Sequence, residues 1–325
     1  MNTRLIGTFC LAALLSGPAY AEVTGEVIAS SLYYSTDTAV MSAANGGQYA
    51  EVPCGSDLTH GGSPRYFLDS VASGYLLPDG YESSVLLAAD EGCAEPLVIT
   101  DTLDTRFSTT PHWSPDGTRI AVYGERWDLT SGALLERGVF VMDVIHDTSG
   151  FPVGTENRRL VISLPGEKIV GWSGDGSSLV YNNEISDGAD GFQSDLFVFD
   201  LFSETTVNLT NSPDISEFAP VFSPVDDRIA YSRWIEVRGA VRNEIFTIDA
   251  SSGAVTQVTS KRNVGTSDSR FPSFSPDGRY LSFSSRNVNA FSSFDIYKVR
   301  SDGSGKAVNL TSKRDGDFRY HVWRK

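Results

Sequence analysis

Basic residues are scarce in this sequence relative to acidic ones. The 325 residues include 26 lysines and arginines against 41 aspartates and glutamates, which gives a formal net charge of −15. Such a balance disfavours nucleic acid and anionic lipid surfaces as partners, because both carry dense negative charge. It suits a protein that stays in solution or that meets a basic or cationic partner.

Long hydrophobic runs are absent after residue 21. Before it, Leu5–Leu15 is apolar apart from Thr8, follows the positive charge of Arg4, and precedes the small-x-small sequence Ala19–Ala21. This pattern predicts a signal peptide over residues 1–21, because an apolar core of about 11 residues is too short to span a bilayer. A membrane anchor is the alternative. We expect a monomeric, periplasmic or secreted product that starts near Glu22 and has no membrane span.

Cysteine is rare, with three residues in the chain. Cys10 follows the large Phe9, which does not fit a lipid-attachment motif, so we expect it to leave with the signal peptide. An even number then remains, and in an exported chain this favours a disulfide between Cys54 and Cys93. Closing a loop of about 40 residues would stabilise the fold by roughly 3–4 kcal/mol. Two free thiols are the alternative.

Signatures of catalysis are also missing. No Gly-x-Ser-x-Gly nucleophile elbow occurs, and in the nearest match, Gly171–Asp175, an aspartate replaces the last glycine. No stretch of about ten residues after the signal peptide has helical periodicity. We therefore assign no catalytic residue, and the sequence favours an all-β, non-enzymatic protein.

What the sequence does contain is an internal repeat. Each copy has an aromatic residue, a serine, a tight turn and an alternating apolar strand. Four copies are clear, at Pro111–Tyr123, Gly171–Tyr181, Pro220–Tyr231 and Pro272–Phe283. Two weaker copies lie at Pro64–Ser70 and Arg319–Lys325. The turn is Ser-Pro-Asp-Gly in its full form, in which Pro fixes φ and Gly takes the positive φ.

The aromatic residues of the repeat count the structural units. They recur at intervals of about 47 to 59 residues, close to the length of a four-stranded propeller blade, at Tyr66, Trp113, Trp172, Phe222, Phe274 and Trp323. The residues between Glu22 and Tyr66, together with those after Trp323, amount to about one more blade length. The spacing predicts a six-bladed β-propeller of four-stranded antiparallel blades over residues 22–325.

The two chain ends are predicted to share the last blade. Phe318–Trp323 would form its innermost strand, and Val27–Pro53 would supply the other three, so that the ring has no open edge. In the other blades the outer strand ends in a shared signature, at Val207–Thr210, Val255–Thr259 and Val308–Thr311.

These repeats resemble those of TolB, the periplasmic component of the Tol–Pal envelope system. Similar repeats occur in propeller domains attached to serine peptidases and in oligogalacturonate lyases. We expect no counterpart here of the N-terminal domain of TolB or of a peptidase domain. The resemblance therefore implies an envelope protein that binds a partner.

Metal chemistry is a weaker possibility. His60, His112 and His321 are predicted to lie at or near the central channel, where three imidazoles could hold a transition metal. Asp187, Asp190 and Asp195 lie in a Gly-rich loop that could hold calcium. Unrelated strand histidines and a solvated loop are the respective alternatives, so no cofactor is predicted, and calcium or a transition metal stays open.

A set of charged residues precedes the inner strands. In a propeller these positions converge on one mouth of the channel, and loops on one face of repeat proteins often carry binding. The residues are Asp104, Arg106, Glu217, Asp268, Arg270, Asp317 and Arg319. We expect a binding scaffold that contacts a protein, peptide or small ligand through this charged mouth. Trp127 and Trp234 lie outside the repeat and are candidates for exposed contacts. A small carbohydrate-active or metal-dependent enzyme is the alternative function.

Overall fold

The computed structural model describes the backbone of six strands between residues 26 and 98, and most of the chain from residue 104 onward. The second part comprises residues 104–107, 112–148, 150, 152–166, 170–184, 193–212, 215–237, 239–287, 293–312 and 317–324. Every element in the described residues is a β-strand or a turn, which agrees with the all-β prediction.

Three sheets contain the first half of the chain and its last strand. In one of them the C-terminal strand β24 (Phe318–Arg324) pairs antiparallel with β1 (Glu26–Ser31), followed by β2 (Thr38–Ser42) and β3 (Tyr49–Val52). The second contains β4 (Leu68–Leu76), β5 (Glu82–Ala89) and β6 (Leu97–Val98). The third contains β7 (Thr105–Phe107), β8 (His112–Trp113), β9 (Arg119–Trp127), β10 (Leu134–His146) and β11 (Pro152–Ser163).

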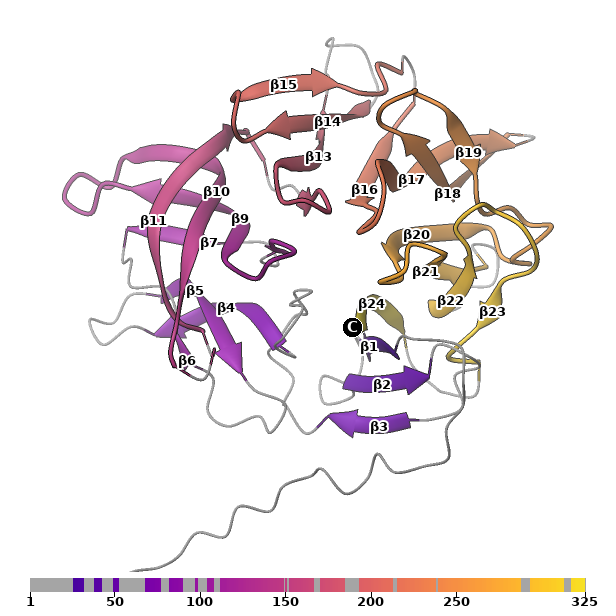
Figure 1. The fold of residues 1–325 in the computed structure, drawn as a ribbon, viewed down its shortest axis with the longest axis horizontal. Coiled ribbons are helices and arrows are strands. Elements are labelled where there is room, and N and C mark those ends of the chain that lie inside the picture. The colour runs from indigo at the N-terminus through magenta and orange to yellow at the C-terminus, as the bar shows by residue number, and fades with distance from the viewer. Residues whose placement is uncertain are drawn as a thin grey trace, which may run out of the picture.

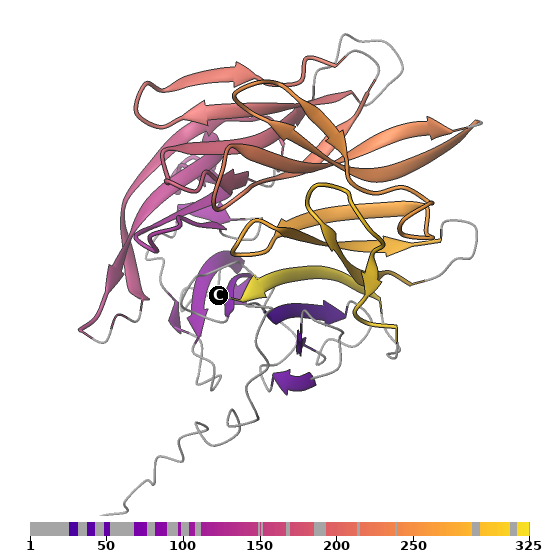
Figure 2. The same cartoon turned by 45° about the vertical axis from the view of Figure 1, so that its right-hand side comes forward.

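The second half forms three four-stranded units in chain order. The first contains β12 (Val170–Trp172), β13 (Ser178–Glu184), β14 (Ser194–Asp200) and β15 (Thr205–Asn208). The second contains β16 (Glu217–Phe222), β17 (Arg228–Val237), β18 (Ala240–Asp249) and β19 (Val255–Gln257). The third contains β20 (Asp268–Phe274), β21 (Tyr280–Arg286), β22 (Asp295–Arg300) and β23 (Val308–Asn309). Figure 1 shows the sheets arranged around a centre, with β16, β20 and β24 close to it, and Figure 2 gives the same arrangement obliquely.

The repeated turn is held by its own side chains. Asp116 Oδ1 accepts hydrogen bonds from Ser114 Oγ and from the Thr118 amide, while Ser114 Oγ accepts one from the Arg119 amide. The same set recurs around Asp175 and Asp277. Gly278, which closes one of these turns, has φ +67°, a conformation that favours glycine. The Ser-x-Asp-Gly motif is therefore a folding device, as the sequence predicted.

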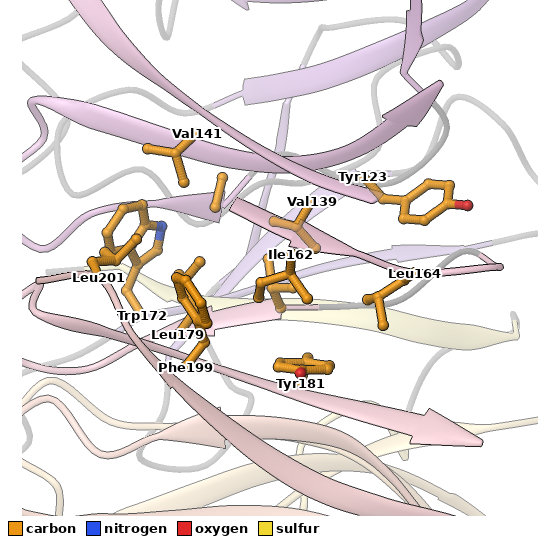
Figure 3. Close-up of a cluster of buried hydrophobic side chains, with 12 residues drawn as sticks. Tyr123, Val139, Val141, Ile162, Leu164, Trp172, Leu179, Tyr181, Phe199 and Leu201 are labelled. Carbon is orange, nitrogen blue, oxygen red and sulfur yellow. The ribbon is translucent and has the colours of Figure 1, made fainter. Parts of the chain in front are cut away.

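The hydrophobic core lies between neighbouring sheets. Figure 3 shows one such cluster, in which side chains of β9, β10 and β11 face those of the β12–β15 unit. The aromatic residues of the repeat are buried in these layers, at Trp113, Trp172, Phe222 and Phe274. The burial of these four side chains shows that their role is packing.

Polar contacts repeat at the same junctions. Trp172 Nε1 donates to the His112 carbonyl at 2.7 Å, and Trp323 Nε1 donates to the Ser273 carbonyl at 3.0 Å. The Arg119 guanidinium lies 4.8 Å from the centre of the Trp172 ring and donates to the Gly176 carbonyl. At these two junctions, neighbouring sheets are thus linked by residues of the repeat.

Candidate binding surface

The inner strands of the second half begin on the same side of the molecule as the third strands of the preceding units. β18 and β20 form a parallel pair at Asn243 and Asp268, and Ser194 and Ser216 form an equivalent parallel bridge one unit earlier. We call this side the mouth, defined by the first residues of β16, β20 and β24 and the last residues of β17 and β21. The predicted charged residues of these strands gather here.

The acidic residues of the mouth are buried. Glu217, Asp268 and Asp317 are exposed to only 1%, 1% and 2%. Asp268 Oδ1 accepts a hydrogen bond from Asn243 Nδ2 at 2.6 Å, and Asp317 Oδ1 accepts one from the Phe294 amide at 2.8 Å. Each of these two carboxylates therefore links its strand to the preceding unit. Their predicted contact with a partner stays a prediction.

Asp268 is the centre of the most charged group in the mouth. Its two carboxylate oxygens accept hydrogen bonds from Arg270 Nε at 2.6 Å and Arg286 Nε at 3.0 Å. Both guanidinium groups lie over the Phe294 ring, at 5.9 and 4.5 Å from its centre. Burial alone would raise the pKa of Asp268, but the hydrogen bonds from Arg270, Asn243 and Arg286 hold that pKa below its usual value. The carboxylate is therefore ionised at neutral pH and fixes both arginines.

Glu217 occupies a comparable place at the start of β16. Arg233 Nε lies 3.8 Å from Glu217 Oε1, and the Arg233 guanidinium lies 5.3 Å from the centre of the Phe246 ring. Burial raises the pKa of Glu217, because Arg233 offsets only part of the desolvation. The pair repeats the arrangement at Asp268 with one arginine in place of two.

Asp104 is the third predicted acid with a described arginine partner. Arg158 Nη1 donates to Asp104 Oδ1 at 2.9 Å, and Arg126 Nη1 lies 3.9 Å from Asp104 Oδ2. Burial by itself would raise the pKa of Asp104. The hydrogen bonds from Arg158 and Thr105 outweigh that effect, so the pKa of Asp104 lies below its usual value. The side chains of Arg106 and Arg319 lie outside the described part of the structure.

Three arginines that lie close to the predicted acids, Arg126, Arg233 and Arg286, were missed by the sequence analysis. All three lie near the end of the second strand of their unit. Arg233 and Arg286 lie directly opposite Glu217 and Asp268 in the register of the paired strands. Finding them would have required the strand register, which is shifted in both inner strands by a bulge. Ala219 and Phe271 lie in these bulges, with φ +51° and +55°.

Two of the three histidines of the predicted metal site, His112 and His321, lie in the described residues. His321 is buried and His112 is half-buried, and desolvation lowers the pKa of each imidazole to about 4. No group of three or more His, Cys, Asp or Glu side chains that could hold a metal occurs in the part that the structure describes. His60 lies outside it.

The other predicted ligand and disulfide positions are only partly described. Asp195 is buried, and its carboxylate accepts hydrogen bonds from Asn208 Nδ2 at 2.7 Å and the Ser212 amide at 3.1 Å. Asp187, Asp190, Cys54 and Cys93 lie outside the described residues, as does the predicted signal peptide.

The exposed tryptophan prediction holds for Trp234. This side chain is 42% exposed and meets the Phe218 ring edge-on, with centroids 6.4 Å apart. Trp127 is only half-buried at the end of β9. Tryptophan and arginine are both enriched among the residues that form binding hot spots in protein interfaces. The mouth can therefore present hydrogen-bond donors, positive charge and an apolar ring on one surface.

Comparison with known proteins identifies the fold. The chain resembles a putative TolB from Agrobacterium tumefaciens, with 17% identity, 92% of this chain and 97% of that chain covered, and a TM-score of 0.59. It also resembles TolB from Acinetobacter baumannii, with 17% identity, coverage of 92% and 66%, and a TM-score of 0.62. Hydrazine synthase from Kuenenia stuttgartiensis matches with 10% identity, coverage of 93% and 47%, and a TM-score of 0.63.

No protein family matches the sequence, and no curated protein matches it either. The sheets and the structural likeness define a β-propeller protein. Within that class its fold resembles the propeller of TolB. Among the described residues, no helix has the length and apolar character needed to cross a membrane.

Proposed function

We propose that this protein is a non-enzymatic scaffold that binds a protein or peptide of the cell envelope through its mouth. The observation that carries this proposal is that arginines at the mouth are held on buried carboxylates, while Trp234 is exposed near the end of β17. Because the carboxylates fix the Nε end of each guanidinium, binding would cost little additional side-chain entropy. A preorganised surface of this kind suits recognition.

We also propose the finer architecture that the repeat implies. Six blades would close into a ring through the last sheet, and the pairing of β24 with β1 supports this arrangement. Export through the signal peptide at residues 1–21 and a Cys54–Cys93 disulfide belong to the same proposal. They are supported by the sequence pattern and by the resemblance of the repeat to that of TolB, a periplasmic protein.

Cross-linking in intact cells tests the proposed function. A photo-cross-linking amino acid is placed at Val241, which is exposed at the mouth end of β18. The matched control places it at Arg279, which is exposed in the turn between β20 and β21 at the opposite end of the strands. We expect a specific envelope partner from Val241 and none from Arg279.

The identity of the captured protein decides the result. Recovery of one dominant partner by mass spectrometry from Val241 alone supports the mouth as the binding surface. Recovery of the same proteins from both positions, or of none from Val241, contradicts the proposal.

A further inference from the structure

The mouth contains one continuous row of side chains that crosses two units. In the strand register Trp234 lies opposite Asn243, Asn243 lies beside Asp268, and Asp268 lies opposite Arg286. Residues directly opposite each other in paired strands project to the same face. The row, which we call the mouth row, therefore places an apolar ring at one end and the paired arginines Arg270 and Arg286 at the other.

The arginines of the mouth row keep donors available. Both use Nε to bind Asp268, and no hydrogen bond from their η nitrogens to another described residue is present. Their side chains are 34% and 31% exposed. The remaining N–H groups of a guanidinium match a carboxylate in a bidentate arrangement.

The charge of this pair also points to a carboxylate. Two guanidinium groups share the single carboxylate of Asp268, so neither arginine has a carboxylate to itself. The nearby carboxylate of Asp317 is buried and accepts from the Phe294 amide. Two adjacent guanidinium groups with unused N–H donors favour a carboxylate as the ligand group.

The length of the mouth row sets the spacing of the ligand groups. Trp234 and Arg286 are three strand spacings apart, which amounts to about 14 Å. An extended chain advances about 3.3 Å per residue, so this distance corresponds to about four residues. The edge-on contact with Phe218 holds the Trp234 ring, so it can act as a fixed apolar anchor.

Resting on the proposed function, we infer that the partner presents an extended segment in which an Asp or Glu side chain binds Arg270 and Arg286. An apolar side chain about four residues away packs on Trp234. This assigns the ligand class of the mouth as an acidic, partly apolar peptide.

Selection from a displayed library of random peptides tests this inference. The purified full chain is compared with the variant Arg270→Gln/Arg286→Gln. Peptides selected on the unaltered protein should share one acidic and one apolar residue about four positions apart. Their affinity should fall at least about tenfold when the acidic residue is changed to its amide, and by a similar factor on the double variant.

Two further variants keep the test independent of folding. Trp234→Ala leaves all three charged groups of the cluster intact and should weaken the same peptides by about tenfold. Arg279→Gln, at the opposite end of the same unit, should leave binding unchanged. Unfolding curves of each variant show whether the fold is retained.

Several outcomes would overturn the inference. These are selected peptides without an acidic preference, acidic peptides that bind the double variant equally well, and binding of anionic vesicles without binding of peptides. If Val241 still cross-links equally to one partner in the double variant, the proposed function stands and only the ligand class assigned here is wrong.

Discussion

The contacts that a residue makes in this protein depend on its position in the repeat. The serine and aspartate of the repeated turn hold its backbone in place, and Asp268 and Asp317 each bind the preceding unit. Glu244, on the other side of the β18–β20 junction, is buried and accepts a hydrogen bond from Thr259 Oγ1 at 2.6 Å. Burial, together with the negative charge of Asp268, raises its pKa to about 7, although Arg242 acts in the opposite direction.

The Glu244 carboxyl should make stability depend on pH near neutrality. Its pKa is about 7 in the folded protein and about 4.5 in the unfolded chain, so the folded state binds more protons between these values. The free energy of unfolding should therefore fall as pH rises from about 4.5 to about 7. Glu244→Gln removes this titration and should reduce the fall by up to about 3 kcal/mol.

Urea unfolding at pH 5 and pH 8 measures this difference. The control is Glu236→Gln, an exposed side chain on β17, which should leave the difference between the two pH values unchanged. An equal fall in stability for Glu244→Gln and the unaltered protein would contradict the assignment.

At the scale of an element, the outer strand of each unit is attached by one threonine. Thr311 Oγ1 accepts a hydrogen bond from the Ile296 amide at 3.0 Å and donates to Asp295 Oδ1 at 2.6 Å. Thr259 forms the same pair of contacts with Ile245 and Glu244. The shared ending of the outer strands is therefore a device that joins the fourth strand to the third.

Replacing this threonine should loosen the outer strand. Thr311→Val keeps the shape of the side chain but leaves the buried Ile296 amide without its partner, which should cost about 1–3 kcal/mol. Thr256→Val, at an exposed position of β19, should change stability by less than about 0.5 kcal/mol. Urea unfolding compares the two. Equal effects would show that the Thr311 hydroxyl does not stabilise the strand.

At the scale of the whole molecule, the last strand joins both chain ends in one sheet. β24 pairs with β1, buries Phe318 and His321, and donates from Trp323 to the Ser273 carbonyl of the preceding unit. A strand in this position contributes backbone pairing, burial and an inter-sheet contact together.

Removal of residues 318–325 should therefore abolish cooperative unfolding and expose the chain to proteases. Trp323→Phe keeps an aromatic ring but removes the indole donor to Ser273, and the loss of that hydrogen bond should cost about 1 kcal/mol. Thermal unfolding and limited proteolysis distinguish the two. A truncated chain that melts and resists protease like the full one would show that β24 is dispensable.

The sequence by itself determined the all-β class, the turns and the buried aromatics. These follow from local rules, because a Ser-Pro-Asp-Gly turn and an alternating strand are encoded by adjacent residues. The same local rules placed Glu217 and Asp268 at the starts of inner strands, on one side of the sheets.

Only the tertiary structure decided what those charges do. Whether Asp268 faces solvent or a neighbouring unit depends on the bulge at Phe271 and on the pairing of β18 with β20. Arg286 reaches Asp268 because the two residues are opposite each other in the pairing of β20 with β21. A shift of this register by one residue would turn the Arg286 side chain to the other face of the sheet. The sequence therefore located the mouth, while long-range register buried its acidic residues and left its arginines and Trp234 partly exposed at the surface.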